Sequence, residues 1–216
     1  MDTYDKFSQT FSKSRKNMKW LEIEYFIKFL NSIPGSTIPG LNSDNISILD
    51  IWCWNWRLID NLWQLDKKFD YLWIDSSSWM IEEARKLHNG SDFNVLDMLE
   101  ISSLKKRFDA IFFIASFHHL ETKELRLKVL WDVKKLLNDW WIVFMTNWNL
   151  FSEENINKYK ETILWSGDFE IKIWEYSRYY HGFKSDELEE LFLNSWFEVV
   201  ENKIFEWWRN IVSILR

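Results

Sequence analysis

Residues 46–57 read ISILDIWCWNWR, and the chain changes character within this segment. Four of the six residues from Ile46 to Ile51 are apolar, which is typical of a short strand buried in a sheet. The residues from Trp52 to Arg57 then turn, and residues 58–65 have the apolar spacing of a helix. A strand, a tight turn and a helix in this order are typical of a mostly parallel sheet covered by helices.

The same alternation continues along the chain. We expect strands at 46–51, 71–75, 93–96, 108–114 and 142–146, helices at 18–31, 58–65, 78–88 and 122–137, and a turn at 138–141. After residue 149 we expect helices at 153–164 and 185–194 and an antiparallel strand pair at 197–204 and 210–215. These elements predict an α/β fold in four segments: a helical arm and cap (1–45), a core of alternating strands and helices (46–149), an insertion or lid (150–183) and a C-terminal helix with two strands (184–216).

Composition excludes several classes of protein. The 216 residues are enough for one α/β domain with a lid, and 47% hydrophobic with 28% charged residues excludes a disordered chain. No apolar run approaches the roughly 18 residues of a membrane span, and the polar start lacks a signal peptide, so we expect a cytoplasmic protein. The single Cys53 excludes an internal disulfide framework and a cysteine-rich metal site.

The balance of tryptophan and glycine is unusual. The chain has 16 Trp and 5 Gly, whereas an average chain of this length carries roughly 15 Gly, about 7%. Pairs such as Trp140-Trp141 and Trp207-Trp208 stand at expected turns, where glycine is favoured and bulky rings are not. We hypothesise that many of these tryptophans are glycines in the natural protein, encoded by UGA read as glycine. The alternative is a truly tryptophan-rich protein, and the codons at positions 52, 54 and 56 decide between the two.

With glycine at these three positions, residues 50–57 become D-I-G-C-G-N-G-R. This string resembles the first motif of the class I S-adenosylmethionine-dependent methyltransferases, whose loop receives the methionine part of the cofactor. Glycine permits the positive φ and the close backbone approach that such a loop needs. The resemblance covers roughly residues 45–146 and 184–215 and implies a Rossmann-like, seven-stranded, mostly parallel sheet with an antiparallel last strand. A glycine-rich turn alone also fits other nucleotide-binding Rossmann proteins.

Acidic residues end the next two expected strands. The resemblance implies that Asp75 holds the ribose hydroxyls, that Asp97 faces the adenine with Met98 beside the ring, and that Asp50 supports the loop. From the residues alone, Asp75 could instead cap a helix and Asp97 could be a solvated loop acid. The cofactor is expected to be S-adenosyl-L-methionine, bound by Asp50, Trp52, Cys53, Trp54, Asn55, Trp56, Arg57, Asp75, Ser76, Met80, Asp97, Met98, Ile114, Ala115 and Ser116.

Two further segments narrow the resemblance. Residues 108–120 look like the fourth motif of the superfamily, and 136–141 like its helix end and Gly-Gly turn. The block Arg178-Tyr179-Tyr180-His181-Gly182-Phe183, with Phe7 to Trp20, resembles the tRNA wobble-uridine carboxymethyl methyltransferases, which are relatives of the AlkB-homologue tRNA enzymes. By this pattern Trp20 and Trp148 look like true tryptophans; Trp52, Trp54, Trp56, Trp73, Trp140, Trp141 and Trp196 look like glycines, as do Trp79, Trp207 and Trp208, while Trp63, Trp131, Trp165 and Trp174 are not assigned.

The resemblance implies a carboxylate as methyl acceptor, which is ionised at pH 7 and needs no general base. We therefore expect side chains that hold the acceptor, and the catalytic candidates are His118, His119, Arg178, Tyr179, Tyr180 and His181. One histidine could instead act as a base for an N–H or O–H acceptor. The alternatives are packed imidazoles near the cofactor and a purely structural lid. No metal is expected, because two adjacent histidines point in different directions.

Charge leaves the acceptor open. The net charge of −6 argues against a broadly basic surface, yet residues 6–19 contain five basic side chains, no acid and aromatic rings suited to stacking on bases. A solvated basic helix face explains the same pattern. We expect methyl transfer to a modified wobble uridine of tRNA, with or without a helper subunit. A small-molecule O- or N-methyltransferase and a non-catalytic binding module are the alternatives.

Overall fold

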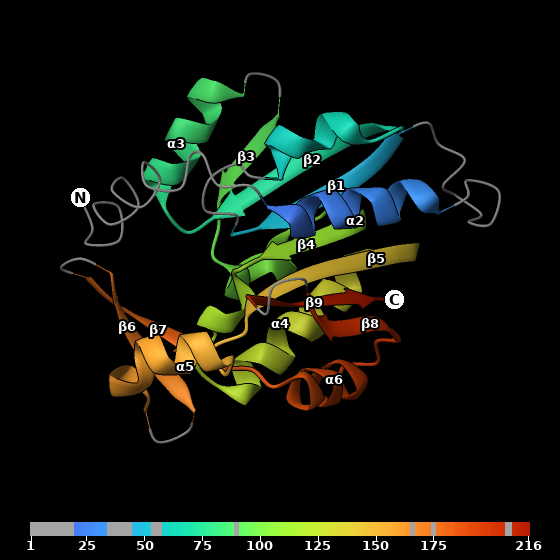
Figure 1. The fold of residues 1–216 in the computed structure, drawn as a ribbon. Coiled ribbons are helices and arrows are strands. Elements are labelled where there is room, and N and C mark those ends of the chain that lie inside the picture. Colours follow the sequence, from blue (N-terminus) through green and yellow to red (C-terminus); the bar gives the residue numbers. More distant parts are fainter. Residues whose placement is uncertain are drawn as a thin grey trace.

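The computed structural model describes residues 20–33, 45–52, 58–88, 91–164, 167–173, 176–205 and 209–216. Its main sheet has seven strands in the order β3-β2-β1-β4-β5-β9-β8 (Figure 1). They are β1 (Asn45–Ile51), β2 (Lys68–Asp75), β3 (Asp92–Val95), β4 (Phe108–Ile114), β5 (Leu137–Trp148), β8 (Val199–Ile204) and β9 (Asn210–Leu215). The strands from β3 to β5 are parallel, and β9 runs antiparallel to β5 and β8. The expected fold class is confirmed.

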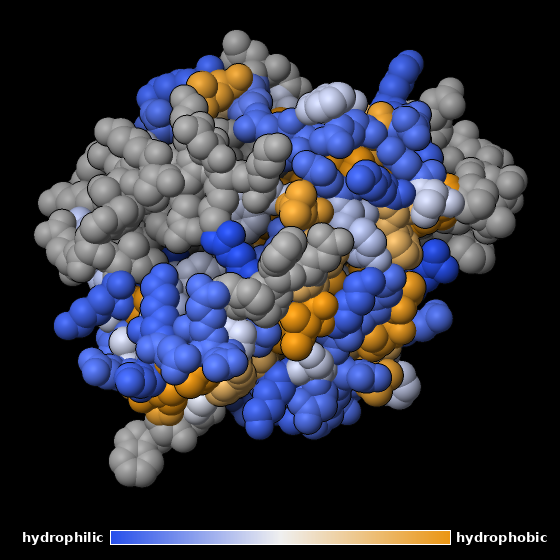
Figure 2. Space-filling view, viewed as in Figure 1, coloured by the Kyte–Doolittle hydropathy of each residue, from blue (hydrophilic) through white to orange (hydrophobic). Residues whose placement is uncertain are grey.

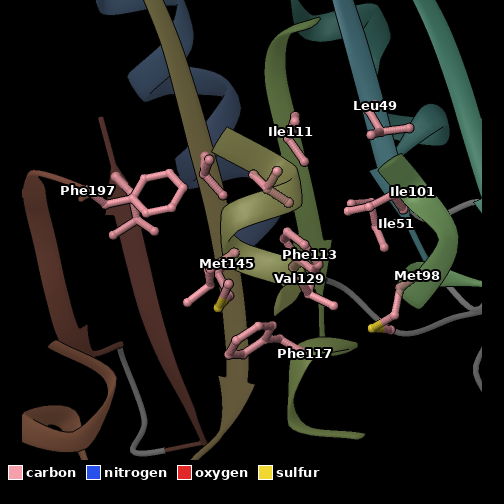
Figure 3. Close-up of a cluster of buried hydrophobic side chains, with 14 of the residues drawn as sticks. Leu49, Ile51, Met98, Ile101, Ile111, Phe113, Phe117, Val129, Met145 and Phe197 are labelled. Atoms are coloured by element: carbon pink, nitrogen blue, oxygen red, sulfur yellow. The ribbon is translucent and has the colours of Figure 1, made fainter. Parts of the chain in front are cut away.

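Helices bury both faces of this sheet. α2 (Leu21–Ser32), η1 (Ile59–Gln64) and α3 (Ser78–Leu87) pack on one face, and η2 (Met98–Ser103), α4 (Lys123–Leu136) and α6 (Ser185–Asn194) pack on the other. Neighbouring residues of one strand serve opposite faces, as in β4, where Phe112 joins the first core while Ile111 and Phe113 join the second. Figure 3 shows the second core, with Phe113, Val129 and Met145 from three different elements.

Local side-chain bonds explain where several helices begin. The Ser77 hydroxyl accepts a hydrogen bond from the Met80 amide and starts α3, and Thr122 does the same for Leu125 at the start of α4. Such bonds satisfy amides that have no partner inside the helix. These helix starts lie within a residue of their expected positions. None of the described helices has the length and apolar character that crossing a membrane requires.

A small second unit follows β5. It consists of α5 (Glu153–Tyr159), η4 (Lys160–Thr162) and a hairpin of β6 (Asp168–Ile173) with β7 (Tyr176–His181). The hairpin lies beside the edge where the parallel strands end (Figure 1), and hydrophilic residues cover most of the surface over α5 (Figure 2). Gly182 directly follows β7, at a position too crowded for a side chain. A Cβ there would lie 2.7 Å from the Gly167 carbonyl oxygen.

Three local expectations were wrong, and one hairpin was not expected. The expected helix at 58–65 is a short 3-10 helix, and the expected helix at 153–164 ends at Tyr159 before another 3-10 turn. The expected turn at 138–141 belongs to β5, because the ladder passes from the pair Phe108–Leu137 directly to Ala110–Ile142 and leaves the intervening residues as an irregularity. The hairpin of β6 and β7 was not expected, since its polar and aromatic residues show no clean alternation.

Candidate active site

Buried acids stand where the first two strands of the sheet end. Asp50 is the next-to-last residue of β1 and Asp75 is the last residue of β2, and both are fully buried. The parallel pairing of β1 with β2 and β4 brings these ends to one edge. Open α/β sheets bind ligands at this edge, so it is the candidate site.

Asp75 has one carboxylate oxygen engaged and one available. Its Oδ1 accepts a hydrogen bond from the Ser77 amide at 2.8 Å, while the buried Oδ2 has no hydrogen-bond partner among the described residues. Burial raises the pKa of Asp75 to about 7, and the positive charge of Arg178 counteracts part of that rise. The side chain that caps α3 is Ser77, so Asp75 is not needed as the helix cap. Its buried oxygen Oδ2 can therefore accept a hydrogen bond from a hydroxyl of a bound nucleoside.

Asp50 and Trp52 define the turn after β1. Asp50 Oδ2 accepts a hydrogen bond from the Tyr71 hydroxyl at 2.6 Å. Trp52 has a φ of 61°, in the left-handed region that favours glycine. Its ring packs edge-on against the imidazole of His119, with ring centroids 5.9 Å apart. The remaining expected loop residues, Cys53, Trp54, Asn55, Trp56 and Arg57, lie outside the described residues.

Some of the other expected cofactor residues lie at this edge of the sheet, and the others lie in the two hydrophobic cores. Ala115 has a φ of 55°, and its amide donates to the Thr146 hydroxyl at 2.8 Å. Ser116 beside it is buried, and its hydroxyl has no hydrogen-bond partner in the part of the chain that the structure describes. Asp97 caps η2 by accepting from the Leu99 amide at 2.8 Å, and half-buried Ser76 follows β2. Met80 and Ile114 are buried in the first core, and Met98 is buried in the second (Figure 3).

His118 and His119 lie in η3 (Phe117–His119), which begins after the two residues that follow β4. His118 is buried, and its Nδ1 accepts a hydrogen bond from the Trp148 amide at 3.3 Å. Burial, with the charges of Arg178 and His181, lowers its pKa to about 3. Burial also lowers the pKa of His119 well below its ordinary value, again with Arg178 adding to the effect. Both imidazoles are therefore neutral at pH 7.

The hydrogen bonds define which nitrogen carries the proton in each neutral ring. His118 Nδ1 acts as an acceptor, so its proton is on Nε2. His119 Nδ1 lies 3.0 Å from the carbonyl oxygen of Tyr179, which can only accept, so its proton is on Nδ1 and its lone pair is on Nε2. The two adjacent histidines thus present different groups.

Alternation along β7 divides the expected residues of the lid into two sets. Tyr180 packs against His119 with ring centroids 4.6 Å apart and stacks on Trp148 at 4.9 Å with an interplanar angle of 12°. The charge of Arg178 acts on Asp75, His118 and His119. Arg178 and Tyr180 therefore belong to the candidate site, as residues two apart on one face of a strand do.

Tyr179 and His181 bond to a different group of side chains. The Tyr179 hydroxyl accepts a hydrogen bond from Arg126 at 3.1 Å, and burial raises its pKa. His181 bonds through Nδ1 to Asp168 and through Nε2 to Glu187 at 2.7 Å. Sequence reasoning missed Arg126, Asp168 and Glu187, because these contacts join segments that are far apart in the chain.

Comparisons with known proteins agree with this fold. Residues 48–139 match the model of a methyltransferase domain family. The fold is similar to an S-adenosylmethionine-dependent methyltransferase from Clostridium acetobutylicum, with a TM-score of 0.70 and 12% identity over 100% of this chain and 99% of that one. A methyltransferase from Methanosarcina mazei gives 0.64 and 20% over 82% and 96% of the two chains. An amino pentose methyltransferase from Micromonospora echinaspora gives 0.65 and 13% over 100% and 97%. No curated protein matches the sequence.

The fold is thus that of the class I methyltransferases, and the matched domain begins in β1 and ends within β5. Residues 48–139 are thus similar to a methyltransferase domain, and the similar solved structures include enzymes that use S-adenosyl-L-methionine as the cofactor. The described residues fit this cofactor, since Asp75 offers a buried acceptor oxygen and Ser116 a buried hydroxyl at the edge where it would bind.

Proposed function

We propose that the protein methylates a carboxylate, the carboxymethyl group of a modified wobble uridine in tRNA. The observation that carries this proposal is Arg178, whose positive charge acts on Asp75 and on both neutral histidines of η3. An arginine beside neutral imidazoles attracts an anionic acceptor and can bind both carboxylate oxygens. The resemblance of residues 178–183 to the carboxymethyl methyltransferases of tRNA supports the same acceptor.

When bound, the cofactor supplies a methyl group on a positively charged sulfur. Asp75 would hold its ribose through Oδ2, and the turn at Trp52 would receive its methionine part. Arg178 would hold the acceptor carboxylate so that one of its oxygens faces the methyl group that the cofactor would supply. No proton moves, so neutral His118 and His119 are suited to orient the acceptor and exclude water rather than to act as bases.

Transfer of labelled methyl groups tests the acceptor. We expect methylation of tRNA that carries carboxymethyluridine at the wobble position and none of the matched tRNA that carries the carbamoylmethyl form, because only the first has a carboxylate. Methylation of a small-molecule extract but not of either tRNA would favour a small-molecule methyltransferase. Calorimetry that detects no binding of S-adenosylmethionine by protein with glycine at positions 52, 54 and 56 would favour a binding module.

We also propose that tryptophans of the cofactor turn and of several other turns are glycines in the cellular protein. Trp52 and Trp196 are two of the three non-glycine residues with positive φ in the described chain. Trp196 follows α6 with a φ of 64°, its amide bonds to the Leu193 carbonyl, and the Phe197 amide bonds to the Phe192 carbonyl. These two bonds form the motif in which helices usually end on glycine.

The intact mass of the protein isolated from its own cells tests this second proposal. Each replacement removes the mass of one indole ring with its methylene carbon, and peptide sequencing places it. Glycine at positions 52 and 196 is expected. Tryptophan at both positions, with UGG codons, would contradict the proposal.

A further inference from the structure

Arg126 is a buried cation at the meeting point of three elements. It lies in α4, and its Nε donates to the Leu120 carbonyl at 3.1 Å while one terminal nitrogen donates to the Glu121 carbonyl at 3.2 Å. The same nitrogen donates to the Tyr179 hydroxyl in β7 at 3.1 Å, and the other lies 3.8 Å from Glu187 in α6. A buried charge is costly unless such partners surround it, so this arrangement is unusual for a residue that serves packing alone.

Tyr179 connects Arg126 to the candidate site. Its hydroxyl donates to the Glu121 carbonyl at 2.9 Å and accepts from Arg126, so the ring is held at its far end. Its main-chain carbonyl accepts the Nδ1 proton of His119. One residue therefore joins the buried guanidinium to the imidazole that faces Tyr180 and Trp52.

We propose that Arg126 is a positioning residue for methyl transfer. Through Tyr179 it sets the position of β7 against η3, which keeps the proton of His119 on Nδ1 and keeps Arg178 and Tyr180 on the acceptor side. Loss of this contact lets β7 shift, so that His119 loses its carbonyl partner and Arg178 no longer meets the carboxylate in the productive position. This inference rests on the proposed acceptor site, but its effect on His119 does not depend on the identity of the acceptor.

Nitrogen NMR of histidine rings tests the inference directly. The chain has 4 histidines, so labelling them gives few signals, and a His119→Asn variant assigns those of His119. In the unaltered protein we expect His119 as the Nδ1-protonated form. In two variants we expect a mixture of the Nδ1-protonated and Nε2-protonated forms of His119. Arg126→Met keeps a side chain of similar length without the charge, and Tyr179→Phe keeps the main-chain carbonyl but removes the hydroxyl. Arg126→Lys should restore part of the original signal.

Kinetics supply the second readout. We expect the kcat for tRNA to fall about 10- to 100-fold in Arg126→Met, because displacement of about 1 Å at a reacting centre has effects of this size, while the affinity for S-adenosylhomocysteine stays within about twofold. Lys135→Met on the exposed side of α4 is the matched control and should change neither value.

If Arg126→Met does not fold, Tyr179→Phe decides the matter. Unchanged His119 signals in Tyr179→Phe would overturn the inference. Failure of the unaltered protein to methylate carboxymethyluridine would instead overturn the proposed function, and the His119 signals would still judge the role of Arg126.

Discussion

The Ser77 amide donates to one carboxylate oxygen of Asp75 at 2.8 Å and leaves the other oxygen buried without a hydrogen-bond partner among the described residues. Asp75 is thus held in place by one oxygen and is ready to bind a ligand with the other. Its pKa of about 7 means that the free protein carries this carboxyl partly protonated near neutral pH. Cofactor binding and stability should both depend on its protonation.

Cofactor affinity should rise with pH. A carboxylate accepts from ribose hydroxyls, whereas the protonated carboxyl competes as a donor, so affinity should increase up to about pH 7 and then level off. Calorimetry with S-adenosylhomocysteine from pH 5.5 to 8.5 measures this. Asp75→Asn should bind about 10- to 100-fold more weakly, because it loses a bond to a charged group, and should show little pH dependence. Equal affinity of the unaltered protein at pH 5.5 and 8 would contradict the assignment.

The pH dependence of stability should combine two opposite effects, one from the buried histidines His118 and His119 and the other from Asp75. The pKa of His118 falls from 6.5 to about 3, so its contribution is present above pH 6.5 and is lost as the pH falls. The pKa of Asp75 rises from 3.8 to about 7, so stability is lost as the pH rises through that window. Between about pH 4 and 6.5 the two oppose each other. Asp75→Asn should therefore lose stability more steeply toward acid, by up to about 1.4 kcal/mol per pH unit, in urea unfolding at several pH values. A slope equal to that of the unaltered protein would count against the buried, protonated Asp75.

Arg178 should determine acceptor binding. Arg178→Gln removes a charge that the carboxylate needs, so the KM for tRNA should rise about 10- to 100-fold, as expected for hydrogen bonds to a charged group. Because Arg178 lowers the pKa of Asp75, the pH at which cofactor affinity levels off should also move upward. Arg178→Lys keeps the charge but cannot bind the carboxylate in a bidentate way, so its KM for tRNA should lie between those of the unaltered protein and Arg178→Gln. An unchanged KM would show that Arg178 does not contact the acceptor.

Glycine at position 196 should stabilise the protein. Trp196 is 83% exposed and has a positive φ, so Trp196→Gly should raise the free energy of unfolding by about 1 kcal/mol, the cost of this conformation for residues with a Cβ. Trp196→Ala keeps the Cβ and should give little of this gain. Trp131→Gly, within α4, should destabilise, because glycine weakens a helix interior. Thermal and urea unfolding compare the three variants.

Glycine at position 52 should have a further effect on ligand binding. Trp52→Gly removes an indole from the turn that would receive the cofactor and relieves a φ of 61°. We expect tighter binding of S-adenosylhomocysteine by this variant, while Trp196→Gly should leave the affinity unchanged because it lies after α6. Equal affinities of Trp52→Gly and the unaltered chain would indicate that the indole does not obstruct the site.

Much of the fold could be predicted because its signals are local. The apolar runs of β1 and β4 and the helix starts at Thr122 and Ser77 each lie within a few neighbouring residues. The 3-10 turn at 59–64 and the long β5 could not be predicted in this way; in β5, the pairs Phe108–Leu137 and Ala110–Ile142 on either side of residues 138–141 make one strand of two paired parts. Tertiary pairing can override local propensity.

The candidate site was only partly predictable. Asp50, Asp75 and the histidines of η3 could be placed because each lies near the carboxyl end of an apolar strand. The candidate residues of β7 could not be assigned to its two faces from sequence, because β7 reads YSRYYH and both of its faces are polar or aromatic. Sequence therefore listed Arg178, Tyr179, Tyr180 and His181 together, whereas the structure places them in two different networks.

The order of apolar and acidic residues along the chain was sufficient to determine the α/β class and the edge that holds the candidate site, because strand ends at one edge follow from parallel pairing. Two of the tryptophans that the sequence indicates as glycines, Trp52 and Trp196, have a positive φ in the structure. The pairing of His119 with Tyr179, 60 residues away, and of Arg126 with Tyr179, 53 residues away, was decided only by the packing of β7 on η3 and α4. Contacts between distant segments produce no repeating pattern in the sequence, because the residues next to one partner in the chain do not depend on the identity of the other partner.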